Sequence, residues 1–214
     1  MDSMLEITVM LLLLADLALF GISRLSTCIT VVALQGVLLG FYALFAQWDA
    51  LSVRLIAIAV FSAAVKGLVF PFLIKRAVKE AGILREIVPF VSYGLSVIVG
   101  VVLLGVSLWM GSKIALHAVP LHPFAVPASF MTLFTGLFLI IARKKALLQC
   151  LGYIVCENGI YMFGMAAVGE VPALIEFGIL LDAFVAVFVM GIVIYHINRE
   201  FDHIDTDRLS SLKG

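Results

Sequence analysis

The chain has 214 residues, of which 64% are hydrophobic and 13% are charged, and its mean hydropathy is +1.20. A water-soluble domain of this length cannot bury so much apolar surface, so the composition predicts an integral membrane protein. The net charge is zero and there is no basic tract, which argues against nucleic-acid binding. Cys28, Cys150 and Cys156 have no CxxC spacing, so we expect no metal, iron–sulfur or other cofactor site in this chain.

In chain order, apolar runs of about 20 residues predict an all-α, polytopic membrane protein with seven transmembrane helices. The predicted spans are 4–22, 26–46, 53–74, 86–109, 124–142, 146–168 and 172–197. We expect a four-to-five-helix bundle over 1–145, a three-helix unit over 124–197 that overlaps the bundle at the fifth span, and a polar tail over 198–214. In the second span, Gly36 and Gly40 are four residues apart, a spacing that lets helices approach closely.

The basic residues predict the orientation of the chain, because lysine and arginine accumulate in cytoplasmic loops. One side receives Arg24, Lys75, Arg76, Lys79, Arg85, Arg143, Lys144, Lys145, Arg199, Arg208 and Lys213, whereas the other receives Arg54 and Lys113. We therefore expect the N-terminus outside and the C-terminus in the cytoplasm.

Four ionisable residues fall near the middle of the predicted spans. Glu157 and Asp182 lie about 15–17 Å into spans six and seven, close to the centre of a ~30 Å hydrocarbon core. Lys66 and Asp16 fall in the same layer, and Glu176 lies nearer the outer end of span seven. Because ionisable groups are costly at this depth, they predict a proton pathway. The structural alternative is a buried Lys66–Asp16 pair that holds helices together.

Four segments carry a family resemblance. They are GYIVCENGIYMF (152–163), VPALIEFGILLDAFVAVFVMG (171–191), VKGLVFPFL (65–73) and DTDRLSSLKG (205–214). They resemble component E of hydrogenase-4, a membrane subunit of formate hydrogenlyase and group 4 [NiFe]-hydrogenase complexes. The last three spans are also similar to the K subunit of respiratory complex I and to the C subunit of multi-subunit cation/proton antiporters.

The resemblance to the K subunit extends to individual residues. It places Asp182 near the glutamate of the third K-subunit helix. Matching Gly152 and Asn158 to the glycine and asparagine of the second helix puts Ile154 where the K subunit has its glutamate. Glu157 lies three residues later, roughly on the same helix face.

The resemblance implies a non-catalytic membrane-arm subunit of an energy-converting complex in a prokaryotic inner membrane. NiFe and Fe–S centres would then belong to partner subunits, and the partners would be antiporter-like and complex I-like membrane subunits, a peripheral hydrogenase or related redox module, and lipids. Two interpretations stay open: a proton- or sodium-pathway subunit, and a scaffold that docks antiporter-like subunits to the hydrogenase module. A free-standing transporter or retinal receptor fits less well, because span seven has no lysine for a Schiff base and no internal repeat is evident.

Overall fold

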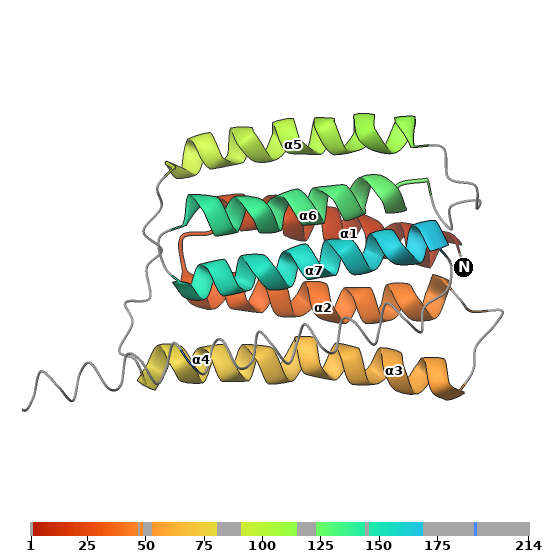
Figure 1. Ribbon diagram of the computed structural model, residues 1–214, viewed down its shortest axis with the longest axis horizontal. Helices are drawn as coiled ribbons and strands as arrows, with labels where there is room; N and C mark the ends of the chain where they lie inside the picture. Colours follow the sequence, from red (N-terminus) through yellow and green to blue (C-terminus); the bar gives the residue numbers. More distant parts are fainter. Residues whose placement is uncertain are drawn as a thin grey trace, which may run out of the picture.

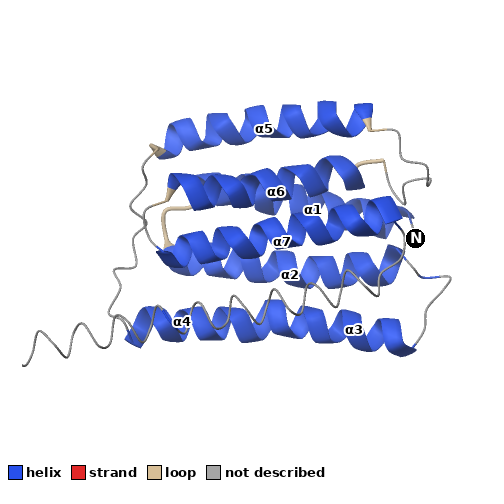
Figure 2. Ribbon diagram, in the orientation of Figure 1, coloured by secondary structure: helices blue, strands red, loops and turns tan. Residues whose placement is uncertain are grey.

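The computed structural model describes residues 2–46, 48, 53–80, 91–114, 123–143, 146–168 and 191. The regular elements of this part are all helical (Figure 2). In order they are α1 (Asp2–Gly21), α2 (Leu25–Ala46), α3 (Val53–Ala64), the π-helix η2 (Val65–Val69), α4 (Phe70–Glu80), α5 (Tyr93–Lys113), α6 (Ala125–Ala142) and α7 (Ala146–Val168).

The helices lie side by side with their axes nearly parallel (Figure 1). The line formed by α3, η2 and α4 occupies one edge and packs on α2, while α5 occupies the opposite edge and packs on α1 and α6. We call the end where α1 and α6 finish and α2 and α7 begin the basic end, because Arg24, Lys75, Arg76, Lys79 and Arg143 lie towards it.

The membrane prediction is confirmed for the described residues. Among them, Ser3–Gly21, Leu25–Ala46, Tyr93–Lys113 and Ala125–Ala142 are long and apolar enough to cross a bilayer. Many large apolar side chains on the outer helices are exposed, including Leu68 on η2 and Trp109 on α5, as expected for a surface that faces lipid. The predicted span 172–197 lies outside the described residues, so the total of seven spans and their orientation stay predictions.

The fourth span begins later than predicted. Tyr93 opens α5 because Ser92 is its N-cap, with φ −55° and ψ 150°, and the Ser92 hydroxyl accepts a hydrogen bond from the Leu95 N–H at 3.5 Å. Such a cap supplies an acceptor for one of the otherwise free N–H groups of a first turn. The third span ends later than the predicted residue 74, because α4 continues to Glu80. The long side chains of Lys75 and Lys79 in these last turns can reach the polar surface of the membrane.

A π-turn interrupts the third span at Val65–Val69. The Phe70 N–H donates to the Val65 carbonyl, five residues back rather than four. This wider turn inserts one extra residue and changes which side chains face the bundle. Pro71 follows immediately, and it has no backbone N–H with which to continue either pattern.

Among the described helices, α6 and α7 pack with their backbones in direct contact. A methyl group added at Gly136 would meet the Cys156 backbone nitrogen, and it would lie 2.5 Å from the Gly152 carbonyl oxygen. One added at Gly159 would lie 2.6 Å from the Leu133 backbone nitrogen. Glycine thus lets the two backbones touch directly, the use of small residues expected where helices pack within a membrane.

Candidate functional site

Lys66 and Glu157 form a buried ion pair at the centre of the bundle. The π-turn directs Lys66 towards α7, where its Nζ lies 2.7 Å from Glu157 Oε1. Each side chain is only 4% exposed. An unpaired charge at this position would cost several kcal/mol, so each residue makes the other tolerable. The pair joins the third span to the sixth, 91 residues apart in sequence.

Asn158 and Tyr161 complete the surroundings of the ammonium group. Lys66 Nζ also donates to Asn158 Oδ1 at 3.1 Å and lies 5.7 Å from the centre of the Tyr161 ring. A lysine ammonium has three donors, so one N–H remains beyond these two hydrogen bonds. Glu157 Oε2 and Asn158 Nδ2 are also buried without a hydrogen-bond partner among the described residues. The site therefore has unused hydrogen-bond donors and acceptors that can bind a water molecule or a mobile proton.

A second polar cluster surrounds Asp16, which is fully buried on α1. Gln35 Nε2 on α2 donates to Asp16 Oδ1 at 2.8 Å, and Thr132 Oγ1 on α6 lies 2.7 Å from Asp16 Oδ2. Thr135, one turn along α6, is buried as well and donates to the Met131 carbonyl. The cluster thus holds together three helices without a cation among its described contacts.

The Thr132 hydroxyl lies within hydrogen-bonding distance of two acceptors. Thr132 Oγ1 lies 2.9 Å from the Ala128 carbonyl as well as 2.7 Å from Asp16 Oδ2. A hydroxyl has one hydrogen and can donate to only one of these acceptors. The Thr132 hydroxyl therefore donates either to Asp16 or to Ala128, and Asp16 Oδ2 lies at the shorter of the two distances.

Helix α2 brings the two clusters next to each other. Gln35 contacts Asp16, and the next residue, Gly36, faces Lys66: a methyl group on Gly36 would lie 2.5 Å from Lys66 Cβ. The same close packing occurs one turn on, where Gly40 lies against Ala63. The predicted role of Gly36 and Gly40 in close helix packing is therefore confirmed.

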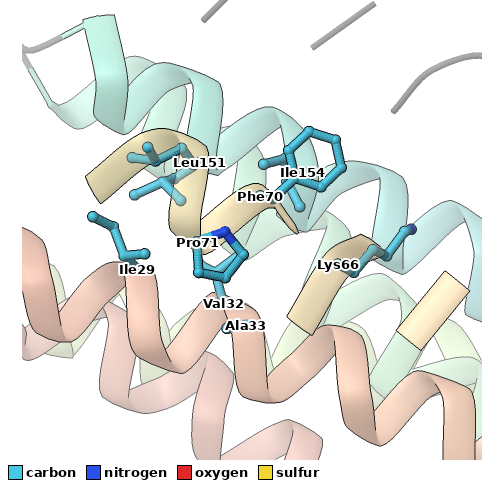
Figure 3. Close-up of a pocket in the computed structure, with 9 residues that line it drawn as sticks. Ile29, Val32, Ala33, Lys66, Phe70, Pro71, Leu151 and Ile154 are labelled. Atoms are coloured by element: carbon cyan, nitrogen blue, oxygen red, sulfur yellow. The ribbon is translucent and has the colours of Figure 1, made fainter. Parts of the chain in front are cut away.

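A small cavity of about 10 Å³ adjoins Lys66 (Figure 3). Its remaining walls are apolar and come from three helices: Ile29, Val32 and Ala33 of α2, Phe70, Pro71 and Ile74 of α4, and Leu151 and Ile154 of α7. Figure 3 shows Lys66 at its edge, with the side-chain nitrogen directed away from Pro71.

Arg143, counted above among the loop charges, is fully buried directly after α6. Its Nη2 donates to the Phe20 carbonyl at 3.1 Å, near the end of α1, and its guanidinium lies 5.3 Å from the centre of the Tyr93 ring. Burial lowers the pKa of Arg143 from its ordinary value, but an arginine stays charged in a protein. A cation at the C-terminal end of α1 also interacts favourably with the helix dipole.

Three of the five predicted site residues are described, and the structure places all three in the bundle interior. Lys66 contacts Glu157, so the alternative pairing of Lys66 with Asp16 is wrong. Asp182 and Glu176 lie outside the described residues, and their roles stay predictions. Gln35 and Thr132 could not be singled out from the sequence, because uncharged polar residues are common in membrane helices. Asn158, which the resemblance matches to the asparagine of the K subunit, accepts a hydrogen bond from Lys66.

Comparison with known proteins agrees with this architecture. Residues 124–214 match the family model for NADH-ubiquinone/plastoquinone oxidoreductase chain 4L. The chain is 33% identical over 164 residues to the uncharacterized protein Rv0085 of Mycobacterium tuberculosis, which covers 74% of this chain and 73% of that protein. It is 35% identical over 79 residues to hydrogenase-4 component E of Escherichia coli (strain K12), which covers 37% of each. The chain belongs to one family with Rv0085, and over about a third of its length it is similar to hydrogenase-4 component E.

The similarity to hydrogenase-4 component E and to chain 4L agrees with the resemblance of the four quoted segments. The match to component E spans about a third of that protein, and the match to the 4L model begins just before α6. Glu157 and Asn158 lie inside the 4L segment, whereas Lys66 and Asp16 lie before it. No solved structure matches the chain.

Proposed function

We propose that this chain is a non-catalytic membrane-arm subunit of an energy-converting hydrogenase-type complex, and that its Lys66–Glu157 pair takes part in proton or sodium translocation. Redox chemistry would occur at NiFe and Fe–S centres in partner subunits. The chain would cross a prokaryotic inner membrane seven times, with the N-terminus outside and the C-terminus in the cytoplasm.

One observation carries this proposal: a lysine and a glutamate in contact at 2.7 Å, both nearly inaccessible, halfway along the bundle. In a low dielectric the charged and neutral forms of such a pair are closer in free energy than in water, so a proton can move between them. The Asp16 carboxyl group supplies a further protonatable group nearby, because Gln35 contacts Asp16 and the next residue, Gly36, packs against Lys66.

A scaffold is the second candidate, and the geometry of the same pair favours it as well. Lys66 and Glu157 compensate each other's charge and tie together α7 and the third span, as a structural brace would. In that case the chain would dock antiporter-like subunits to the hydrogenase module without carrying protons.

The substitution Glu157→Gln separates the two functions, since glutamine keeps the shape and the hydrogen bond but cannot titrate. The purified complex in vesicles would be assayed for ion uptake and electron transfer together. We expect an assembled, redox-active complex that translocates fewer ions per electron pair. Glu6→Gln, an exposed acid on α1, is the matched control and should leave coupling unchanged.

Unchanged coupling in Glu157→Gln would refute the relay and leave the scaffold. If that variant did not assemble, Asp182→Asn would be tested in the same way, because the same depth argument applies to it.

A further inference from the structure

The cavity beside Lys66 lies on one side of the ion pair. Along α2 its wall residues end at Ala33, before Gly36 reaches the level of Lys66. Along α4 they begin at Phe70, after Lys66, and along α7 they end at Ile154, before Glu157. On all three helices the wall is therefore displaced towards the basic end. The cavity therefore lies between the ion pair and the basic end of the bundle.

Pro71 lines this apolar cavity and lacks the backbone N–H of other residues. Because proline has no backbone N–H, it cannot donate to the Lys66 or Gly67 carbonyl, to which a residue at position 71 would otherwise donate in a π- or α-pattern. Within a membrane, a carbonyl freed by proline is commonly satisfied by an ordered water. The cavity volume of about 10 Å³ is at the lower limit for one water molecule.

We propose that this cavity holds a water molecule, bound to the carbonyl that Pro71 leaves free, and that this water gives protons from the basic end access to the Lys66–Glu157 pair. The bound water is inferred from the cavity and from Pro71, whereas its role in proton access rests on the proposed function. Lys66 is the only polar side chain among the described wall residues, and the volume leaves room for no more than one water molecule.

Proton entry into the pair takes three transfers. A proton on Lys66 Nζ moves to Glu157 Oε1 across their 2.7 Å contact, which leaves a neutral amine and a neutral acid. The flexible lysine stem turns the amine towards the cavity, where it takes a proton from the water. The hydroxide left in the cavity takes a proton from a hydronium ion of the solvent at the basic end, so one solvent proton has entered the pair and none is created or lost.

Hydroxyl-radical footprinting in the wild-type complex tests for the water directly. X-ray pulses generate radicals from water, including bound water, and label the side chains beside it. Phe70 lines the cavity and is 3% exposed, whereas Phe20 is 1% exposed and packs on Phe138 away from it. We expect clear labelling of Phe70 above Phe20, with the label carrying ¹⁸O after exchange into H₂¹⁸O. Equal labelling of the two rings would overturn the proposal.

A pair of matched variants tests the access role. Ala33→Val fills the cavity, while Ala57→Val adds the same two methyl groups at an exposed position of α3. We expect Ala33→Val to abolish the excess label on Phe70 and to slow ion uptake with electron transfer intact, and Ala57→Val to do neither.

If Ala33→Val removed the label but left uptake unchanged, the access role would be refuted. The Glu157→Gln result would be unaffected by that outcome, so failure of this inference is distinguishable from failure of the proposed function.

Discussion

Removing one member of the Lys66–Glu157 pair should destabilise the protein more than removing both. Lys66→Met leaves a buried carboxyl group without its cation, and Glu157→Met leaves a buried ammonium without its anion. The double variant places two flexible apolar side chains of similar length in contact. We therefore expect the double variant to be more stable than either single variant.

The magnitude follows from the contact geometry. At the observed 2.7 Å and an effective dielectric constant of about 20, the Coulomb attraction is roughly 6 kcal/mol. Most of it offsets the cost of removing both charges from water, but the loss of one partner leaves that cost uncompensated, typically about 3–5 kcal/mol. For a chain of this size, each kcal/mol lowers the melting temperature by about 2–4 °C, so each single variant should melt roughly 6–20 °C lower.

The chain contains its own unfolding reporters. Cys28, Cys150 and Cys156 are free and buried, so a thiol-reactive fluorophore reacts as the bundle opens on heating. Lys75→Met, an exposed lysine on α4, is the control and should change stability by no more than about 0.5 kcal/mol. If the double variant lost the sum of the two single effects, the residues would be energetically independent, and our reading of the ion pair would be wrong.

Two further substitutions test the polar cluster and the helix contact. Asp16→Asn should melt close to the wild type, because the asparagine side chain can still hydrogen-bond Gln35 and Thr132, whereas Asp16→Leu should melt clearly lower. Equal losses would contradict a hydrogen-bonding role for Asp16. Gly136→Ala should cost about 1–3 kcal/mol or more in the same assay, because its methyl group meets the Cys156 backbone. Gly105→Ala, with open space around it, should be neutral or slightly stabilising, and a loss there as large as at Gly136 would contradict the packing argument.

The positions of the helices could be predicted well from the sequence. Apolar run length determines where a span begins and ends, and the predicted 124–142 and 146–168 agree with α6 and α7 to within one residue. The start of α5 could not be predicted in this way, because the Ser92 cap is a local hydrogen bond within an otherwise apolar stretch.

The partners of the buried charges were not predictable from sequence. Counting residues gives the depth of Lys66, Asp16 and Glu157, but partner choice depends on how each helix is rotated. The π-turn changes that rotation for Lys66, and the nearby Pro71 is its only local signal. The Thr132 contact depends on the packing of α6 against α1, for which the sequence carries no comparable pattern.

The two residues of the ion pair lie on opposite sides of residue 124, where the match to chain 4L begins. Glu157 belongs to the segment that matches chain 4L, which begins at residue 124, and Lys66 belongs to the part of the chain before it. A polypeptide made of the matched segment alone would carry the acid without its counter-ion and would need a cation from a neighbouring subunit. Joining both on one polypeptide fixes their ratio at one to one during synthesis. Glu157 and Lys66 are then synthesised and inserted into the bilayer on one chain. Neither charge stays unpaired before the other subunits assemble.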